Sequence, residues 1–298
     1  MSDQPAARAE VCAVVITYHP DRDFPARLTR VLAQVDAAVI VDNGSTDAEL
    51  ELLQAAVAPG ITLLCNHANL GVARALNIGV RRAIADGFSW ALLLDQDTEV
   101  DPDMVRELLA ARDSCPDPGR LAVVGSSFRD TNARPADILR LAAQGDLWEE
   151  VESVITSGSL LSLRAYQATG PFREEFFIDH VDTEFCFRAR SAGYRVFQTR
   201  RPLMSHTVGA PTSHRLLGTR KWTTNHSPDR RYYIARNNTV MLREYGAPGG
   251  GSWRVKSAVR CMRLIKRVAL YETDKVKKII AVAQGWWDGV RGNLGPRP

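Results

Sequence analysis

Acidic side chains follow two of the apolar runs in the N-terminal part of the chain. Asp42 comes directly after residues 37–41, and Asp95 and Asp97 come after residues 90–94. Two carboxylates two positions apart at the end of a buried strand can hold one divalent cation, with a diphosphate completing the shell. Two acids at this spacing are also common where they only solubilise a strand end. Their place directly after a strand and before the start of a helix favours the cation site.

Two polar segments follow the second and third expected strands. The first begins at Asp42 and reads Asp-Asn-Gly-Ser-Thr-Asp, and the second runs from Asn69 to Gly79 and includes Arg74. Taken alone, the first segment is better explained as a turn and a helix cap than as a ligand site. The second places free backbone N–H groups and a cation at a helix start, which suits an anionic ligand. A helix cap with a solvated arginine is the structural alternative for the second segment.

The elements that must position these residues alternate between strands and helices. Strands are expected over residues 11–17, 37–41, 61–65 and 90–94, with helices over about 23–34, 46–57 and 69–86. Continuous Val, Ile and Leu runs are typical of strands buried on both faces, and strand-helix-strand repetition implies parallel pairing. We therefore expect an α/β doubly wound, mostly parallel sheet with flanking helices. Ligands of such sheets lie beyond the carboxyl ends of the strands, where the acids stand.

The second half of the chain has a different pattern. Strands are expected over residues 121–125, 153–163 and 195–199 and helices over 184–192 and 231–245, with a weakly patterned polar stretch over 126–150. A Pro and Gly cluster at residues 247–251 then precedes one long basic helical pattern from 253 to about 285. We expect a domain over residues 1–250 and a basic helical tail over residues 251–298.

The tail carries a large excess of positive charge. Residues 251–298 hold 11 Lys and Arg against 3 Asp and Glu, whereas the preceding residues hold 27 against 31. Apolar residues at helical spacing, among them Val255, Met262 and Ile265, lie between these basic residues. Such a helix can lie on an anionic membrane surface, which attracts each Lys or Arg by about 1 kcal/mol. A helix packed on the preceding domain explains the pattern equally well, and Trp286 and Trp287 suit both.

Length and composition exclude several classes of protein. A chain of 298 residues that is 45% hydrophobic and 24% charged is a globular protein with a buried core. Its longest apolar runs are far shorter than the roughly 20 residues of a membrane-spanning helix, and residues 1–10 lack a signal peptide, which predicts a cytoplasmic protein. Five widely spaced cysteines suit neither a disulfide framework nor a zinc site, so we expect buried thiols.

Several motifs in register resemble glycosyltransferase family 2, whose enzymes have the GT-A fold and use nucleotide sugars. They are Val-Val-Ile-Thr-Tyr at 14–18, Val-Asp-Asn-Gly-Ser at 41–45, Asn-x-Gly-x-Ala-x-Ala-x-Asn-x-Gly at 69–79, and Asp-x-Asp at 95–97. Segments 94–97, 155–160, 176–182 and 231–237 are more narrowly similar to its bacterial rhamnosyltransferase branch. The resemblance covers roughly residues 11–245. It implies a nucleotide-sugar-binding half over about 1–120 and an acceptor-binding half over about 121–250.

The resemblance implies a donor site at the strand ends. Asp42 would contact the base and ribose, Asp97 would bind Mg²⁺ or Mn²⁺ at the donor diphosphate, and Asp95 would assist through the ribose or a metal-bound water. His206 stands where related enzymes often place a metal-binding imidazole, although a lone histidine is more often structural. The residues expected to contact the donor are Thr17, Tyr18, Asp42, Asn43, Asn69, Arg74, Asp95, Gln96 and Asp97.

Inverting transfer also needs a base that deprotonates the acceptor hydroxyl. Family members carry it in a Glu-Asp-x-Asp-x-x-x-Arg segment before a Gly-Tyr-x-Val strand. Anchoring this pattern on Arg188 makes Asp182 the base and Glu184 the following acid, with a valine in place of the usual first Glu. Asp179 is the second candidate, and helix capping by these acids is the structural alternative. The residues expected to contact the acceptor or diphosphate are Thr156, Ser157, Gly158, Arg231, Tyr232, Tyr233, Arg236 and Asn237.

The expected function is transfer of L-rhamnose from dTDP-rhamnose to a lipid-linked or polysaccharide acceptor in cell-surface glycan synthesis. The enzyme would be cytoplasmic and peripheral on the inner face of the cell membrane. A nucleotidyltransferase acting on sugar phosphates is the alternative, but residues 18–21 are not the Gly-rich and basic loop expected of one. Only the basic tail favours a nucleic-acid-binding protein, without any recognised motif, so no nucleic-acid partner is expected.

Overall fold

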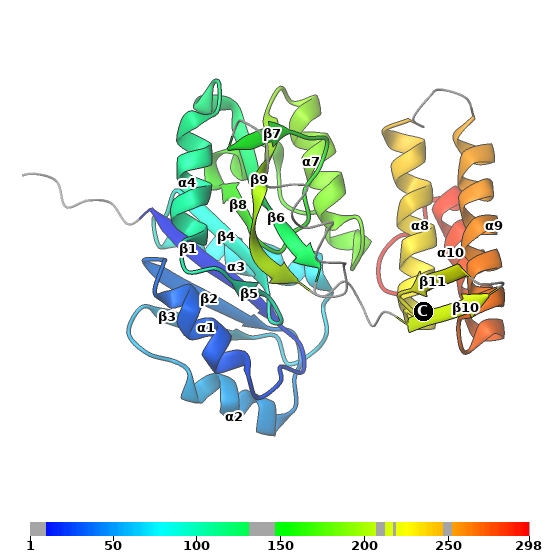
Figure 1. The fold of residues 1–298 in the computed structure, drawn as a ribbon, viewed down its shortest axis with the longest axis horizontal. Helices are drawn as coiled ribbons and strands as arrows, with labels where there is room; N and C mark the ends of the chain where they lie inside the picture. Colours follow the sequence, from blue (N-terminus) through cyan, green and yellow to red (C-terminus); the bar gives the residue numbers. More distant parts are fainter. Residues whose placement is uncertain (1–9, 131–146, 207–211, 217–218, 247–251, 298) are drawn as a thin grey trace, which may run out of the picture. The chain divides into compact units, whose positions relative to one another are not determined.

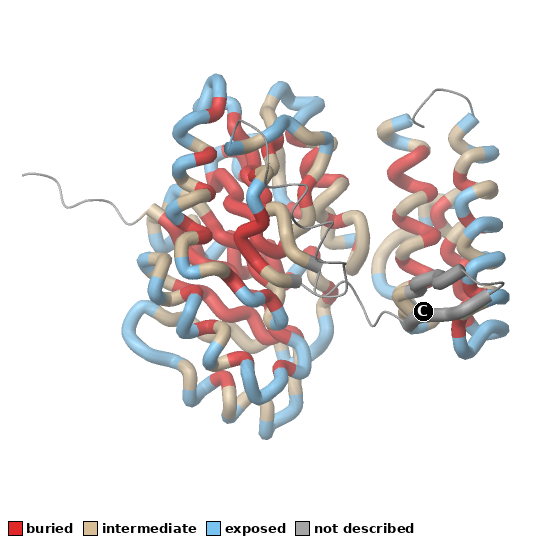
Figure 2. The backbone as a smooth tube through the Cα atoms, in the orientation of Figure 1, coloured by how far each residue is buried: buried red, intermediate tan, exposed pale blue. Residues whose placement is uncertain are grey.

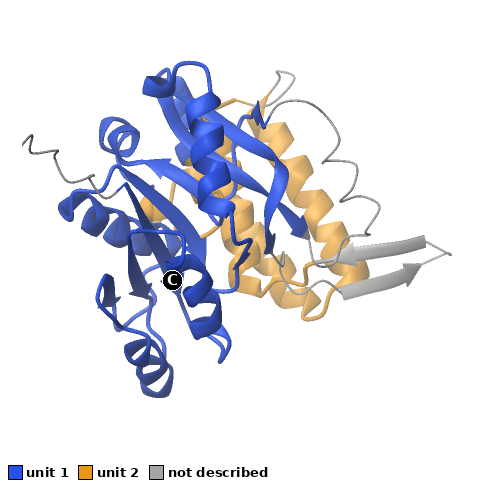
Figure 3. Cartoon of the chain, turned by 60° about the vertical axis from the view of Figure 1, so that its left-hand side comes forward, with its two compact units in different colours: residues 1–172, 185–206 blue, residues 173–184, 207–298 orange. Residues whose placement is uncertain are grey.

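The computed structural model describes residues 10–130, 147–206, 212–216, 219–246 and 252–297, in two compact units (Figure 1 and Figure 3). Unit 1 comprises residues 1–172 and 185–206, and unit 2 comprises residues 173–184 and 207–298. The domain boundary expected at residue 250, and the Pro and Gly cluster beside it, lie outside the described residues. The helices on both sides of that boundary belong to unit 2.

The N-terminal part of unit 1 folds as its apolar runs predict. Its strands are β1 (Val11–Thr17), β2 (Ala37–Asp42), β3 (Ile61–Cys65) and β4 (Trp90–Asp95), which pair in parallel in the order β3-β2-β1-β4. The helices between them are α1 (Phe24–Leu32), α2 (Asp47–Ala55) and α3 (Val72–Ala85). Because the four strands are parallel, the polar residues that follow them share one edge of the sheet.

The remaining strands of unit 1 make the sheet mixed. They are β5 (Glu99–Val100), β6 (Leu121–Asp130), β7 (Trp148–Glu150), β8 (Ser159–Ser162) and β9 (Arg195–His206). The full order is β3-β2-β1-β4-β8-β6-β9-β5 with β7 beside β9; β8 is antiparallel to both neighbours and β9 is parallel to β6. The helices of this part are α4 (Met104–Ser114), η1 (Pro118–Arg120), α6 (Leu163–Thr169) and α7 (Val181–Ser191). The expected α/β sheet with flanking helices is confirmed.

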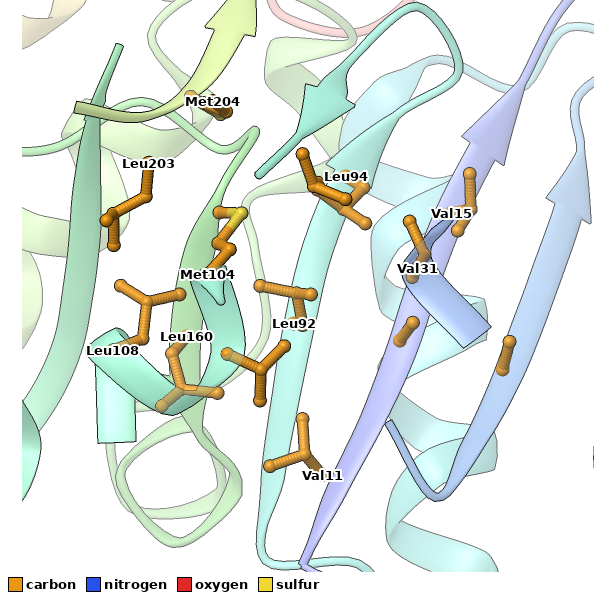
Figure 4. Close-up of a cluster of buried hydrophobic side chains, with 14 of the residues drawn as sticks. Val11, Val15, Val31, Leu92, Leu94, Met104, Leu108, Leu160, Leu203 and Met204 are labelled. Carbon is orange, nitrogen blue, oxygen red and sulfur yellow. The ribbon is translucent and has the colours of Figure 1, made fainter. Parts of the chain in front are cut away.

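The sheet is buried on both faces. Val11, Ala13 and Val15 alternate along β1 and join a cluster of apolar side chains from α1 and α4 (Figure 4). On the other face α3 packs so closely that a Cβ atom on Gly79 would lie 2.4 Å from a methyl carbon of Val14. The central strands are buried along their length in Figure 2. Burial on both faces explains why the strand sequences are continuously apolar.

Two expected elements of unit 1 are corrected. The strand expected over residues 153–163 is only β8 (Ser159–Ser162). It ends at Ser162 because the hydroxyl of this residue accepts a hydrogen bond from the backbone N–H of Ala165 (3.2 Å) and caps α6. The strand expected over 121–125 continues to Asp130 along β9. Most of the weakly patterned polar stretch, residues 131–146, lies outside the described residues.

Unit 2 contains a bundle of three helices, α8 (Pro228–Glu244), α9 (Trp253–Tyr271) and α10 (Lys275–Arg291). Its other elements are η2 (Glu174–Phe176), the first turn of α7, and a hairpin of β10 (Thr212–Leu216) and β11 (Thr219–Thr223). The single long helix expected from residue 253 is two helices, because Asp274 has a left-handed backbone (φ 51°) that a right-handed helix does not continue through. A Cβ atom on Gly285 would lie 2.2 Å from the Tyr232 carbonyl oxygen, so glycine lets α10 approach α8.

A buried ionic cluster ties the tail helices to α8. The Glu272 carboxylate forms ion pairs with Arg231 of α8 and with Lys278 of α10 (Nζ to Oε2, 3.2 Å). Lys278 also donates a hydrogen bond to Oδ1 of Asn225 (2.6 Å). Because removal of one partner from a buried ion pair costs about 3–5 kcal/mol, α9 and α10 are bound to α8 as part of the same unit.

The cysteines were expected to be buried free thiols, and one of them differs from this expectation. All five are unbonded to one another, and four are buried, but Cys65 at the end of β3 is only half-buried. Burial raises the pKa of the Cys12 thiol to about 12, which leaves it protonated and unreactive. In the described part of the chain, no helix has the length and apolar character needed to cross a membrane.

Candidate functional site

The ends of β1, β2 and β4 bring the sequence-predicted donor residues to one edge of the sheet in unit 1. Thr17 is the register partner of Asp42, and Ile16 is the register partner of Asp95. Thr17 and Asp42 are fully buried, and the Thr17 hydroxyl donates a hydrogen bond to Oδ1 of Asp42 (3.1 Å). The predicted convergence of polar residues at this edge is therefore present in the structure.

Asp42 organises the loop that follows β2. Its carboxylate accepts hydrogen bonds from the backbone N–H of Gly44 (3.1 Å), the backbone N–H of Ser45 (3.0 Å) and the Ser45 hydroxyl (2.5 Å). Gly44 has φ +99°, and a Cβ atom there would lie 2.7 Å from the carbonyl carbon of Ala68, so only glycine fits. The turn explanation of this segment is therefore correct, and the buried Asp42 carboxylate holds the turn together.

Asn43 and Asn69 join the loops after β2 and β3. The Asn43 amide donates to Oδ1 of Asn69 (3.0 Å), and Oδ1 of Asn43 accepts from the backbone N–H of Leu70 (3.1 Å). Oδ1 of Asn69 also accepts from the backbone N–H of Gly71 (3.0 Å), at the start of α3. Arg74 is exposed on the first turn of this helix. The two polar segments of the sequence are thus joined by hydrogen bonds.

Gln96 fixes the backbone at the end of β1. Its Oε1 accepts from the backbone N–H of Tyr18 (2.7 Å), and its Nε2 donates to the Tyr18 carbonyl oxygen (3.0 Å). The Tyr18 side chain remains 45% exposed. Gln96 therefore holds an accessible aromatic ring at the sheet edge, where a nucleotide base can stack on it.

The residues around Asp95 and Asp97 include part of the predicted acceptor-binding set. The backbone N–H of Asp95 donates to the Ser157 hydroxyl (3.2 Å), which also bonds the Thr98 hydroxyl (2.5 Å). The N–H of Gly158 donates to the carbonyl oxygen of Leu93 (2.9 Å). The structure thus places Thr156, Ser157 and Gly158 along the end of β4, beside a half-buried Asp95 and an exposed Asp97.

Asp95 and Asp97 have the chemistry of a Mg²⁺ or Mn²⁺ site, because carboxylate oxygens are the ligands that these cations prefer. No group of three or more His, Cys, Asp or Glu side chains gathers to hold a metal among the described residues. The other ligands would have to be phosphate oxygens and water. The His206 side chain lies outside the described residues. Its backbone ends β9 directly after Ser205, whose register partner is Glu99.

In unit 2 a strained loop precedes the predicted base. Phe177, Asp179 and His180 all have left-handed backbones, with φ of 64°, 63° and 62°. Such conformations are costly for residues other than glycine and persist only where neighbouring groups impose them. The Asn237 amide does so here, because Nδ2 donates to the carbonyl oxygens of Phe176 (2.9 Å), Ile178 (2.8 Å) and Asp179 (2.9 Å).

Arg236 supports the same loop from the neighbouring position on α8. It is fully buried, and Nη2 donates to the carbonyl oxygens of Glu175 (2.8 Å) and Phe176 (3.0 Å). Its Nη1 donates to the Gly295 carbonyl oxygen, which also ties down the C-terminal segment. Arg236 and Asn237 were expected to contact a ligand, and in the structure both donate hydrogen bonds to backbone carbonyl groups.

Asp179 is paired with a cation. Nη2 of Arg230 lies 3.2 Å from Oδ1 of Asp179, and Nε lies 3.3 Å from both carboxylate oxygens. Burial raises the pKa of Asp179, while the Arg230 charge opposes this shift. Burial likewise lowers the pKa of His180, and Arg260 of α9 lowers it further, against the charges of Asp179 and Asp182. The charged groups of this loop therefore interact with one another, and Asp179 is paired with Arg230.

Asp182 and Glu184 stand in the first turn of α7, where the helix dipole favours negative charge. Oδ1 of Asp182 accepts from the backbone N–H of Thr183 (2.6 Å), and the side chain is half-buried. Glu184 is 2% exposed and its Oε1 accepts a hydrogen bond from the Tyr245 hydroxyl (2.8 Å). Of the two, Asp182 is the more exposed.

The start of α8 is packed inside unit 2. Arg231 is paired with Glu272, and the Tyr232 hydroxyl donates to Oδ2 of Asp288 (2.8 Å). Tyr233 stacks on Phe177 with ring centroids 4.9 Å apart, and its hydroxyl accepts from the backbone N–H of Arg297 (2.7 Å). The core-packing explanation for the two tyrosines matches these contacts, and the polar groups of all three residues have protein partners.

Sequence reasoning missed several residues that complete these clusters. Thr98 supports Ser157, Arg230 pairs with Asp179, and Tyr245 bonds Glu184. Thr98 directly follows the Asp-x-Asp segment, and Arg230 directly precedes the Arg-Tyr-Tyr segment, so proximity in sequence could have identified them. Nothing in the sequence marks Tyr245, because its contact spans 61 positions.

Comparisons with known proteins identify the family. The model of "Glycosyl transferase family 2" matches residues 12–160. A "dTDP-rhamnosyl transferase RfbF" of Shigella flexneri is 28% identical over 96% of this chain and 97% of its own length. A "Low-salt glycan biosynthesis hexosyltransferase Agl10" of Haloferax volcanii is 23% identical over 63% of this chain and 64% of its own length.

Solved structures of low sequence identity share the fold. GalNAc-T7, crystallised with UDP, GalNAc and Mn²⁺, aligns with a TM-score of 0.58. TarS 1-349 of S. aureus aligns with a TM-score of 0.56. GalNAc-T7 is 13% identical, with 97% of this chain and 57% of that chain covered, and TarS is 15% identical, with 94% and 81% covered. With a family model that spans half of its length and a GT-A architecture, the chain belongs to glycosyl transferase family 2.

Proposed function

We propose that this glycosyltransferase moves L-rhamnose from dTDP-rhamnose, with inversion, to a lipid-linked or polysaccharide acceptor in cell-surface glycan synthesis. The observation that carries the transfer chemistry is the edge of the sheet in unit 1, where Asp42, Tyr18 and the Asp95 to Asp97 turn converge. The nearly full-length similarity to a dTDP-rhamnosyl transferase supports the choice of donor. Family membership favours glycosyl transfer over the nucleotidyl transfer that the strand-end acids alone also allow.

The donor would bind along this edge through its base, ribose and diphosphate. The exposed Tyr18 ring offers a stacking face, and the immobilised Asp42 carboxylate an acceptor for an imide N–H or ribose hydroxyls. Asn43, Asn69 and Arg74 would line the path toward the diphosphate. Asp97 and Asp95 would hold Mg²⁺ or Mn²⁺, and His206 would be a further ligand. When bound, this cation neutralises charge on the departing nucleoside diphosphate.

Asp182 would act as the base that accepts the proton of the acceptor hydroxyl. It stands half-buried in the first turn of α7, at the position that the family pattern anchored on Arg188 gives to the base. Arg236 and Asn237 would act as positioning residues, because they hold the loop from which α7 begins. Thr156, Ser157 and Gly158 would orient the acceptor or diphosphate beside Asp95.

The enzyme would work in the cytoplasm, on the inner face of the membrane. Val255, Met262 and Leu270 of α9 are 61%, 60% and 52% exposed. The same helix has no acidic residue. An exposed apolar stripe beside basic side chains is the composition of a helix that lies on anionic lipid.

Titration calorimetry with dTDP, UDP and GDP, each with Mg²⁺, tests the choice of donor. We expect dTDP to bind most tightly and dTDP-rhamnose to be turned over in preference to other dTDP sugars. Tighter binding of UDP or GDP would overturn the rhamnose proposal and leave the family assignment in place.

A further inference from the structure

Helices α8 and α9 of unit 2 lie side by side (Figure 1), and residues of both line a cavity of about 270 Å³. At about 30 Å³ per water, it has room for a small polar group and a short length of carbon chain. Its rim carries three guanidinium groups, from Arg260, Arg263 and Arg267. Its floor includes Ala235 and Cys261, which are 2% and 8% exposed. The cavity therefore combines concentrated positive charge with an apolar surface.

These three arginines lack the acidic partners that other arginines of unit 2 have. Within the described residues, none of them forms an ion pair with a carboxylate, whereas Arg231 pairs with Glu272 and Arg173 with Glu244. Arg260 makes one neutral contact, from Nη1 to Oδ1 of Asn238 (3.3 Å). Three guanidinium groups at one rim repel one another unless an anion binds among them, and their planar N–H groups suit a phosphate.

The surroundings favour a phosphate that carries an apolar chain over inorganic phosphate. Ala235, Cys261 and Leu264 supply an uncharged floor that inorganic phosphate would not use. An amphipathic phosphate would use both the cationic rim and the apolar residues.

The cavity adjoins the part of α8 that holds the loop before the proposed base. Arg260 on the rim donates to Oδ1 of Asn238, and the neighbouring residue Asn237 donates to three carbonyl oxygens of that loop. Such a position suits the anionic part of an acceptor.

We propose that this cavity binds the phosphate or diphosphate group of a lipid-linked acceptor, with the first carbons of the lipid on its apolar floor. The identification of the ligand as the acceptor rests on the proposed function, whereas the binding of an alkyl phosphate does not. No covalent step takes place in the cavity. Arg263 and Arg267 supply charge and hydrogen bonds to the phosphate.

The test measures binding of dodecyl phosphate, below its micellar concentration, to the full-length protein by titration calorimetry. Arg263→Gln with Arg267→Gln should weaken binding at least tenfold. The matched control is Arg254→Gln with Lys266→Gln, which removes the same charge from α9 outside the cavity and should change binding less than twofold. The far-UV circular dichroism spectrum, the melting temperature and the dTDP affinity should be unchanged in both variants, which shows that both units are folded.

Three results would overturn the proposal. If the control variant weakens dodecyl phosphate binding as much, the positive charge of α9 as a whole attracts anions and the cavity is not a specific site. If inorganic phosphate binds as tightly as dodecyl phosphate, the cavity binds the anion alone and does not use the alkyl chain. Loss of dodecyl phosphate binding on addition of phosphatidylglycerol vesicles, with vesicle binding itself dependent on Arg263 and Arg267, would identify a bilayer headgroup as the occupant.

The proposal and the proposed function fail in different ways. If dodecyl phosphate binds as expected but the enzyme turns over a donor other than dTDP-rhamnose, the cavity assignment holds and the donor assignment is wrong. If dTDP-rhamnose is turned over but dodecyl phosphate does not bind, the cavity assignment is wrong and the donor assignment holds.

Discussion

Three carboxylates stand close together in sequence before and at the start of α7, in different environments. Asp179 faces Arg230, and Glu184 is buried against Tyr245. Asp182 is half-buried, and its Oδ1 accepts a hydrogen bond from the backbone N–H of Thr183. The proposed role of Asp182 as the base rests on its place in the segment anchored on Arg188, and a comparison of variants at these positions tests it.

Asp182→Asn is expected to lower transfer at least 10²-fold, the effect typical of losing a general base, while donor affinity stays near wild type. Asparagine keeps the size and most of the hydrogen bonding but does not accept the proton. Asp179→Asn should reduce transfer much less, although it weakens the contact with Arg230. Steady-state kinetics with dTDP-rhamnose, with calorimetry for donor affinity, makes the comparison. An active Asp182→Asn enzyme beside an inactive Asp179→Asn enzyme would move the base by three residues.

Asp97→Ala is expected to abolish turnover and to remove the cation dependence of dTDP binding. A diphosphate beside Asp95 and Asp97 is repelled by like charge unless a cation lies between them. Because Asp97 is exposed on the loop after β4, the fold should survive. Glu51→Ala, which removes an exposed acid from α2, is the matched control and should behave as wild type. Full activity of the wild-type enzyme in excess chelator would contradict the role of the cation.

At the scale of elements, α8 acts on the proposed base through the loop that it holds. Asn237 donates to three carbonyl oxygens of this loop, and Arg236 donates to two. The left-handed residues between them would relax if these bonds were lost. The loop leads directly into α7, so its conformation sets the orientation of Asp182 in the first turn of that helix. Helix α8 would therefore influence the reaction through this loop, although it supplies none of the proposed catalytic acids.

Asn237→Ala is expected to reduce the transfer rate without changing donor affinity, because the donor residues lie in unit 1. Each carbonyl group left without a partner in the interior costs about 1–3 kcal/mol, so the melting temperature should also fall. Asn293→Ala removes an amide that bonds Asp288 at the surface and serves as the control. Separate measurement of kcat and donor KM decides the outcome. A loss confined to donor KM would mean that the loop has no part in the chemical step.

The predictable part of the fold is the part encoded by neighbouring residues. The first four strands and three helices follow from local apolar runs and turn residues, and their parallel pairing fixes the common edge that gathers Asp42 and Asp95. The short strand β5 and the end of β6 exist only because β9 pairs with them, and no local pattern encodes such partners. The anchoring role of Asn237 was missed for the same reason, since its partners lie about 60 positions away.

At the scale of the whole molecule, the charge asymmetry of the sequence is a property of unit 2. The basic excess of residues 251–298 resides on α9 and α10, yet some of those charges are internal. Lys278 is 2% exposed and neutralised by Glu272, whereas Arg263 and Arg267 of α9 are exposed. The basic tail is thus neither a free arm nor fully packed, because buried ion pairs hold it to α8 while other basic side chains of α9 are exposed.

This arrangement changes how membrane binding has to be tested. Truncation after residue 250 would remove Glu272 and Lys278 and leave the buried charge of Arg231 without a partner, at a cost of about 3–5 kcal/mol. Loss of membrane binding in such a protein would therefore report unfolding of unit 2. Substitutions on the outer face of α9 avoid this problem, because the side chains concerned make no buried contact.

Val255→Ser, Met262→Ser and Leu270→Ser together are expected to release the protein from vesicles that contain phosphatidylglycerol. These side chains are 61%, 60% and 52% exposed, so burying them in lipid supplies the apolar part of the attraction, and basic neighbours supply the rest. Binding should also fall steeply with salt, since exposed charges are screened within about 10 Å at 0.1 M. Val57→Ser with Leu147→Ser removes exposed apolar side chains from unit 1 and should leave vesicle sedimentation unchanged. Equal sedimentation of the triple variant and wild type would assign membrane contact to another surface or to none.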